Sequence, residues 1–194
     1  MGQHGRRVPD HLGEKFDQVL TAAGVGAGWA AELLWRSLAP AVTGYLRVQG
    51  AAEPDDLTSE VFIGVFHSLA SFSGTEEQFR SWVFTIAHRR LVDERRRLAR
   101  RPPPSSLRTD HANMAAGASA EHEALGRLTS EQVRGLCERL VPDQRDVLLL
   151  RLVGGLTVDE VASALGKSEG AVKALQRRAL LALRKILEKE GVPL

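Results

Sequence analysis

Apolar residues recur along the chain every three to four positions, which is the spacing of one face of an α-helix. The clearest sets are Trp29, Leu33, Leu34, Leu38 and Val42, then Leu57, Val61, Val65 and Leu69, then Phe79, Trp82, Val83, Ile86 and Val92. Two further sets follow at residues 133–140 and 147–152. The sequence does not alternate with the period of two that a half-buried strand requires. It therefore predicts an all-α protein.

Turn and capping residues divide these sets into separate helices. Pro54 and the two carboxylates after it can open one helix, because negative charge is favourable at the positive end of the helix dipole. That helix is expected to end before Phe72, and a loop is expected to continue to Glu77. Pro142 can start another helix, which the two glycines at 154–155 would close.

The stretch from Thr157 to Leu187 has the pattern of two helices joined by a tight turn. Thr157 and Glu160 have the spacing of a capping box, in which a hydroxyl and a carboxylate each accept a bond from a free backbone N–H at a helix start. Gly166 can take the left-handed conformation that ends a helix. Ser168 can then cap the next one.

The second of these helices has one apolar and one basic side. On an ideal helical wheel the apolar side contains Val172, Leu175, Ala179, Leu183 and Ile186. The opposite side contains Lys173, Arg177 and Arg184, together with Leu181, which the pattern does not explain. Two helices around a tight turn, with a basic second helix, predict a helix-turn-helix whose second helix enters the major groove of DNA.

Residues 102–127 separate two helical parts of the chain. The segment begins with three consecutive prolines and then becomes rich in Ala, Gly and Ser without helical spacing. We expect a flexible linker here, between two small helical domains at residues 14–101 and 128–194. Thr129 or Ser130 can cap the first helix of the second domain. Residues 1–13 lack periodicity, and we expect them to form a flexible tail.

Charge is distributed unevenly, although the formal net charge of the 194 residues is only +2. Residues 53–77 contain six acidic side chains and no Lys or Arg, whereas residues 80–101 contain eight Arg and two acidic residues. This excess of Arg is too large for a surface of paired charges, and guanidinium groups bind phosphate well. Aromatic residues in the same segment suit stacking on unpaired bases. The alternative is that Phe79, Trp82 and Phe84 are ordinary core residues, which is the favoured interpretation for Trp82. The pattern indicates two surfaces for two different partners.

Several classes of function find no support in the sequence. Cys137 is the only cysteine, which excludes an internal disulfide and a cysteine zinc cluster, and we expect it to pack in the core. Asp55 and Asp56 have no His or third carboxylate at ligand spacing, so no metal site is expected. Without a catalytic arrangement or nucleotide-binding motif, neither an enzyme nor a cofactor is predicted. The sequence also lacks a leader and a long apolar run, which predicts a cytoplasmic protein without membrane contact.

Two separated segments match the pattern of one protein family, in the family's order. The first contains DDLTSEVF at residues 55–62, Phe66, Phe72, Gly74, and F-R-x-W-V-x-x-I-A at residues 79–87. The second contains LVPDQRDV at residues 140–147, EVA at 160–162, L-G-x-S at 165–168 and GAVK at 170–173. The chain resembles the extracytoplasmic-function group of sigma factors of bacterial RNA polymerase, which keep only the second and fourth conserved regions.

The resemblance implies a subunit that binds core RNA polymerase and promoter DNA, and so works at the nucleoid. The residues implied for core polymerase are Asp55, Asp56 and Glu60. Those implied for recognising and opening the −10 element are Phe72, Arg80, Trp82, His88, Arg89, Arg90, Arg96 and Arg97. Those implied for the −35 element are Ser168, Lys173, Ala174, Arg177, Arg178 and Arg184. Many relatives are held inactive by an anti-sigma protein, which is a further partner to consider.

The chain also departs from the family pattern. His88 and Arg89 stand where the family usually has Arg and Asn, so the preference at the −10 element would differ. Leu175 and Leu180 stand where the recognition helix often carries Arg. The alternative function is a stand-alone helix-turn-helix regulator that binds a duplex operator as a dimer. It would leave the acidic and basic surfaces of the first domain unexplained.

Overall fold

The computed structural model describes residues 12–100 and 135–189, and within these ranges it contains helices and no strand. The all-α expectation is therefore confirmed for the described chain. The predicted tail, the linker and the cap at Thr129 or Ser130 lie outside it. The elements are η1 (Gly13–Lys15), α1 (Phe16–Gly24), α2 (Gly28–Val48), α3 (Pro54–Ser68), η2 (Leu69–Ser71), α4 (Glu76–Arg100), α6 (Pro142–Leu152), α7 (Val158–Leu165) and α8 (Glu169–Lys189).

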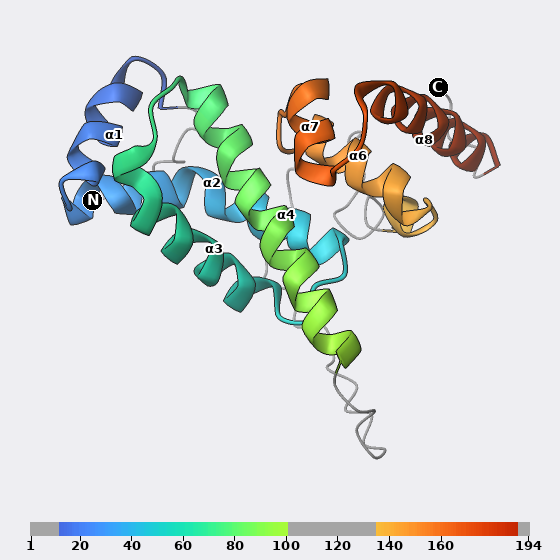
Figure 1. Ribbon diagram of the computed structural model, residues 1–194, viewed down its shortest axis with the longest axis horizontal. Coiled ribbons are helices and arrows are strands. Elements are labelled where there is room, and N and C mark those ends of the chain that lie inside the picture. Colours follow the sequence, from blue (N-terminus) through green and yellow to red (C-terminus); the bar gives the residue numbers. More distant parts are fainter. Residues whose placement is uncertain (1–11, 101–134, 190–194) are drawn as a thin grey trace, which may run out of the picture.

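The first four α-helices pack into an N-terminal domain, and α6, α7 and α8 form a second group beside α4 (Figure 1). The predicted apolar faces supply the first core, since Leu34, Val42, Val61 and Val83 are all fully buried. Trp29 was expected in this core but is 58% exposed, because it lies in the first turn of α2. The helical spacing thus predicted the buried face of α2 correctly except at its N-terminal end.

Helix α4 begins at Glu76, so the expectation of a loop continuing to Glu77 was wrong. Thr75 and Gln78 explain the earlier start. The backbone N–H of Thr75 donates to Gln78 Oε1 at 2.9 Å, and the backbone N–H of Gln78 donates to Thr75 Oγ1 at 3.3 Å. This reciprocal pair is a capping box with glutamine in place of glutamate.

The helix-turn-helix forms as its capping residues predict. Thr157 and Glu160 make both bonds of the capping box, at 2.6 and 3.2 Å. Gly166 ends α7 with a φ of 62°, in the left-handed region. Ser168 Oγ then accepts the backbone N–H of Ala171 at 3.2 Å. In α6, by contrast, Leu152 is 68% exposed although its spacing predicted burial.

One apolar cluster runs through both groups of helices. It joins Phe79 and Phe84 of α4 to Val147 and Leu150 of α6 and Val161 of α7. Cys137 belongs to the same cluster and is buried, as expected. A smaller cluster of Leu140, Leu148 and Ala179 holds α6 to α8. The two domains are therefore in direct apolar contact.

Replacing Gly166 with alanine is expected to lower the free energy of unfolding by about 1 to 2 kcal/mol, because a left-handed backbone is unfavourable for a residue with Cβ. No atom lies within 4 Å of the position that this Cβ would take, so the cost would come from the backbone alone. Gly170→Ala in α8 is the matched control. Its position is also open and its φ is not positive, so alanine should maintain or raise stability. Urea unfolding of both variants measures the difference, and an equal loss in both would contradict this account.

Candidate nucleic-acid interface

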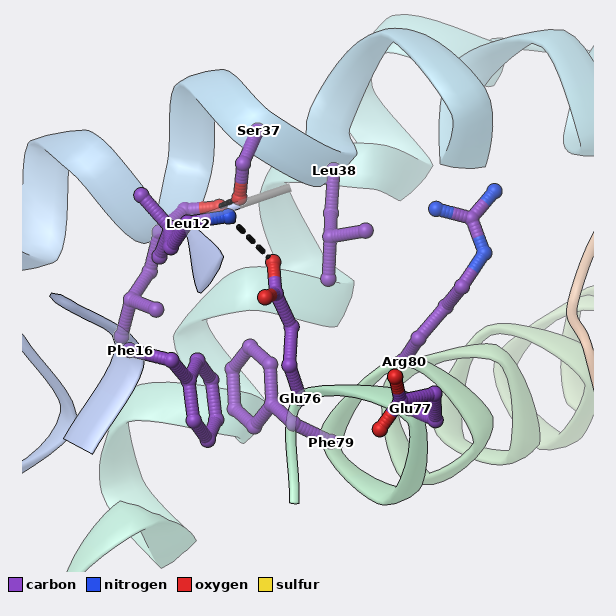
Figure 2. A pocket seen from close by; sticks show the side chains of 9 residues that line it. Leu12, Phe16, Ser37, Leu38, Glu76, Glu77, Phe79 and Arg80 are labelled. Carbon is purple, nitrogen blue, oxygen red and sulfur yellow. Dashed lines mark hydrogen bonds between the residues drawn. The ribbon is translucent and has the colours of Figure 1, made fainter. Parts of the chain in front are cut away.

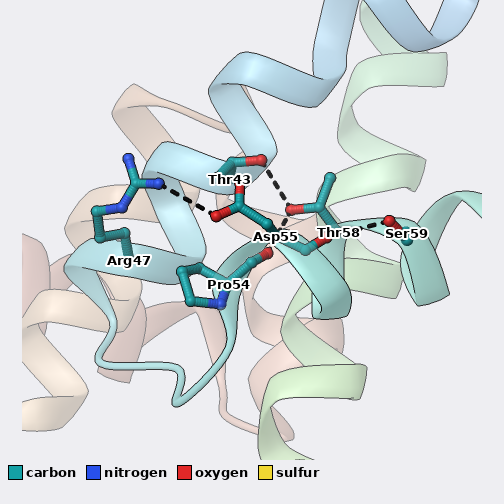
Figure 3. Close-up of polar contacts among 6 residues, drawn as sticks. All are labelled: Thr43, Arg47, Pro54, Asp55, Thr58 and Ser59. Carbon is teal, nitrogen blue, oxygen red and sulfur yellow. Dashed lines mark hydrogen bonds and ion pairs between the residues drawn. The ribbon is translucent and has the colours of Figure 1, made fainter. Parts of the chain in front are cut away.

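The acidic side chains predicted on α3 lie at its N-terminal end, which is anchored to α2 (Figure 3). Thr58 is buried, and its hydroxyl donates to the carbonyl of Pro54 at 2.7 Å. Since that proton is used, Thr43 must donate to Thr58 across their 2.9 Å contact. Asp55 lies 3.6 Å from Arg47 of α2. These bonds fix the first turn of α3 and leave Asp56 exposed beside it.

A groove lies between α3 and the C-terminal half of α4. Its lining residues are Glu53, Asp56, Leu57, Glu60, Glu94, Arg97 and Leu98. Four of these seven residues are acidic, and Leu98 is 46% exposed. The groove thus combines negative charge with one exposed leucine. Such a surface suits a basic helix that carries one apolar side chain.

Two groove residues escaped the sequence-based prediction, and one residue predicted for the −10 element also lies in the groove. Glu53 precedes the predicted helix, and Glu94 lies within the Arg-rich segment, where a count of charge along the sequence hides it. Arg97 was assigned to the −10 element, but its guanidinium lies 3.9 Å from Glu60 in the groove. An exposed pair of this kind contributes little to stability.

Other arginines of α4 divide between exposed side chains and one that is bonded to a neighbouring helix end. Arg89, Arg90 and Arg96 are exposed, and Arg96 lies 3.8 Å from Asp93 of its own helix. Arg95 instead donates to the backbone carbonyl of Gln49 at 2.6 Å. The basic surface of α4 is therefore smaller than the number of arginines suggested.

Three aromatic side chains gather where the loop before α4 meets that helix. The Phe72 ring is stacked on Trp82, with centroids 5.0 Å apart, and meets Phe79 edge-on at 5.4 Å. Phe79 is buried, whereas Phe72 and Trp82 are partly exposed. The two exposed rings form a platform of the kind on which an unpaired base can stack.

A small pocket at the start of α4 is lined on one side by Leu12 and Phe16 of the chain's own N-terminal segment (Figure 2). The backbone N–H groups of Leu12 and Gly13 donate to the two carboxylate oxygens of Glu76, at 2.5 and 2.9 Å. The rings of Phe16 and Phe79 lie 5.7 Å apart in the pocket wall. Glu76 thus ties the start of the described chain to the start of α4.

Two residues assigned to the −10 element are bonded within the protein, one of them buried and the other partly exposed. His88 is only 4% exposed, and its Nδ1 lies 2.9 Å from the hydroxyl of Tyr45. Burial, with a smaller effect from Arg95, lowers the pKa of His88, and burial raises the pKa of Tyr45. The guanidinium of Arg80 donates twice to the backbone carbonyl of Val153, at 3.0 and 2.8 Å. In this arrangement neither side chain is presented to DNA.

The basic side of α8 is presented to solvent. Lys173, Arg177, Arg178 and Arg184 are all exposed, whereas Ala174 is partly buried. Lys173 pairs with Glu169 at 3.1 Å, and Arg184 pairs with Glu188 at 2.8 Å, both within the helix.

Three leucines of α8, at positions 175, 180 and 181, differ in how far they are buried. Leu175 packs against the core, which accounts for an apolar residue where the family often has arginine. Leu180 and Leu181 are 48% and 49% exposed, and nothing in the structure explains them.

Comparison with known proteins decides the family. Residues 34–101 match the model of Sigma-70 region 2, and residues 138–185 match that of Sigma-70, region 4. The chain is 30% identical over 190 residues to the ECF RNA polymerase sigma factor BldN of Streptomyces coelicolor, covering 97% of this chain and 72% of BldN. This chain belongs to the extracytoplasmic-function sigma factors. As an alternative sigma factor it directs transcription, and the stand-alone regulator is set aside.

Other sigma factors are also similar to this chain in sequence, and solved structures share its fold. The chain is 33% identical over 137 residues to ShbA of Streptomyces griseus, covering 70% of this chain and 72% of ShbA. It is 30% identical over 179 residues to SigD of Mycobacterium tuberculosis, covering 89% of this chain and 84% of SigD. The sigma factor RpoE of Bartonella quintana, solved with the anti-sigma factor NepR, shares the fold with a TM-score of 0.62 at 20% identity, over 81% of this chain and 96% of that one. CnrH, solved with the cytosolic domain of CnrY, does so with a TM-score of 0.59 at 22% identity, over 89% and 96%.

Among residues 12–100 and 135–189, no three His, Cys, Asp or Glu side chains are grouped so that they could hold a metal ion. None of the helices in those ranges is long and apolar enough to span a membrane.

Proposed function

We propose that this sigma factor binds core RNA polymerase through the groove between α3 and α4. The observation that carries the proposal is the acidic lining of the groove around an exposed leucine. Asp55, Asp56 and Glu60, which the resemblance assigns to this contact, lie on or beside the groove, and Glu53 and Glu94 extend it. A basic helix of the polymerase would be its partner. This role requires no catalytic step by the sigma factor, because recruitment and positioning of the polymerase account for it.

We further propose that the two DNA elements are contacted by the two domains. Lys173, Arg177, Arg178 and Arg184 of α8 would face the −35 element, with Ser168 and Ala174 at the start of the helix. Phosphate contacts would position the helix and one or two side chains would supply the sequence preference. The stacked rings of Phe72 and Trp82, with Arg89, Arg90 and Arg96 along α4, would hold the unpaired −10 strand. Stacking of this kind contributes about 1 to 3 kcal/mol per base.

The protein would work in the cytoplasm, at the nucleoid, where core polymerase and promoters are found. An anti-sigma protein is a further proposed partner, of the kind that accompanies RpoE in its structure.

Run-off transcription tests the proposed function. Fragmented DNA from the source genome would be transcribed by purified core polymerase with and without this protein, and the transcript starts would be mapped. We expect new starts that share two spaced upstream sequences. If none appears while the protein alone still binds duplex DNA, its role as a promoter-specificity subunit would be refuted.

A further inference from the structure

The start of α4 is held by a part of the chain that precedes the match to Sigma-70 region 2, which begins at residue 34. The two carboxylate oxygens of Glu76 accept the backbone N–H groups of Leu12 and Gly13, which lie 64 and 63 residues earlier in the sequence. Hydrogen bonds to an ionised acceptor are stronger than those between neutral groups. They fix the N-terminal segment, residues 12–24 of η1 and α1, at the start of α4.

A second contact between these parts lies one helical turn after Glu76. Phe79 is three residues further on, and therefore on the same face of α4. Its ring is 1% exposed and lies 5.7 Å from the buried ring of Phe16 in α1 (Figure 2). Helix α1 also contacts η2, the turn that leads directly to Phe72. The N-terminal segment therefore supports the loop before α4 at both of its ends.

Phe79 connects this segment to the platform of Phe72 and Trp82. The Phe79 ring meets Phe72 edge-on at 5.4 Å and lies 5.9 Å from Trp82. Because both platform rings are partly exposed, their order depends on the buried side chain that packs against them. A binding surface that is ordered beforehand binds more tightly, since less conformational entropy is lost when the ligand arrives.

We propose that Glu76 and Phe16 are positioning residues for the capture of the unpaired −10 strand. They hold the N-terminal segment against α4, and the packing of Phe79 then keeps Phe72 and Trp82 stacked before a base arrives. Neither Glu76 nor Phe16 touches DNA in this role. The inference rests on the proposed function, because it requires that the platform binds the −10 strand.

Glu76→Gln tests the inference with a change of sign. A glutamine side chain has one acceptor oxygen, and its amide nitrogen cannot accept the second backbone N–H, so one of the two bonds is lost. The substitution also removes a negative charge, which by itself would favour binding to DNA phosphates. Weaker binding is thus predicted by positioning and not by electrostatics. Glu77→Gln removes the same charge from the same helical turn and is the matched control.

The measurements use holoenzyme assembled from core polymerase and the full-length protein. One oligonucleotide is forked and carries the −10 sequence mapped by run-off transcription on an unpaired strand, and a second is fully paired and carries only the −35 sequence. We expect Glu76→Gln and Phe16→Leu to bind the fork about tenfold more weakly than the wild type, as when most of one stacking contact is lost. Their binding to the −35 duplex and their retention on core polymerase should not change. Glu77→Gln should bind the fork at least as tightly as the wild type.

A double-mutant cycle shows whether Glu76 acts through the platform. Trp82→Ala alone should weaken binding to the fork, because it removes one of the two stacked rings. Adding Glu76→Gln to Trp82→Ala should then weaken binding little further, since two residues that act through one contact are not additive. A residue that only stabilises the domain would give the same loss with and without Trp82.

Three results would overturn the positioning role. They are equal binding of the fork by Glu76→Gln and Glu77→Gln, additive losses in the double variant, and a parallel loss of core-polymerase binding by Glu76→Gln, which would reflect a general loss of the fold. Failure of the proposed function gives a different result. If Trp82→Ala binds the fork like the wild type, the platform is not a −10 contact, and the positioning role fails with it whatever Glu76→Gln does.

Discussion

Transcription from the promoter mapped by run-off transcription is expected to fall roughly 5- to 150-fold when Arg177 is replaced by alanine. This corresponds to a loss of about 1 to 3 kcal/mol in the free energy of promoter binding. Arg177 is exposed on the basic side of α8, one turn after Lys173. The capping box at Thr157 and the left-handed Gly166 fix the angle at which that helix is presented. If Arg177 reads a base edge, its loss removes a bidentate contact that no neighbouring side chain can replace. Run-off transcription under subsaturating protein measures the change.

Arg177→Lys distinguishes a base contact from a phosphate contact. Lysine keeps the charge but lacks the planar pair of donors that matches guanine. A base contact predicts that lysine rescues little and that the loss depends on one position of the −35 sequence. A phosphate contact predicts substantial rescue and a uniform loss across sequences. Wild-type activity of Arg177→Ala at the mapped promoter would remove this residue from the interface altogether.

Binding to core polymerase is expected to weaken by several kcal/mol, more than about a hundredfold, when Asp56 is replaced by arginine. Asp56 lines the acidic groove and is exposed, so the new cation would face the basic surface that the groove is proposed to receive. The buried contacts of Thr58 and the apolar face of α3 are not touched, and the fold should be kept. A pull-down with purified core polymerase measures binding, and circular dichroism checks helicity.

Asp17→Arg is the control for this charge reversal. Asp17 is exposed on α1, and α1 contacts η2 at the opposite end of α3 from Asp56. The variant has the same net charge as Asp56→Arg, but the change lies away from the groove. It should bind core polymerase like the wild type. Equal retention of the two variants on the polymerase would contradict the assignment of the groove.

Local signals account for the parts of the fold that the sequence predicted well. Helix starts and stops depend on side chains within three or four residues, as at Thr157 and Gly166, and these were found in the structure. Helix α4 begins earlier than predicted because Thr75 and Gln78 form a capping box, a signal that the spacing of apolar residues from Phe79 onward does not contain. The family and both domains were recognisable because their motifs are themselves local.

The faces of α4 could not be predicted with the same success. Eight arginines in residues 80–101 indicated one basic surface, yet Arg80 and Arg95 bond to backbone carbonyls and Arg97 lies in the acidic groove. His88 was expected at the DNA and is buried against Tyr45. In each case a neighbour distant in sequence decides the side chain's environment. A helical wheel for one helix contains no information about such neighbours.

The acceptor for Arg80 has a consequence for how this sigma factor could evolve. It is the backbone carbonyl of Val153, which every amino acid supplies, so a substitution at position 153 would not by itself remove it. Mutational drift in the C-terminal domain would thus leave this bond largely intact. Variation in α4 would act differently, because any replacement of Arg80 deletes the donor. Whether this bond forms therefore depends mainly on the residue at position 80, in the N-terminal half of the chain.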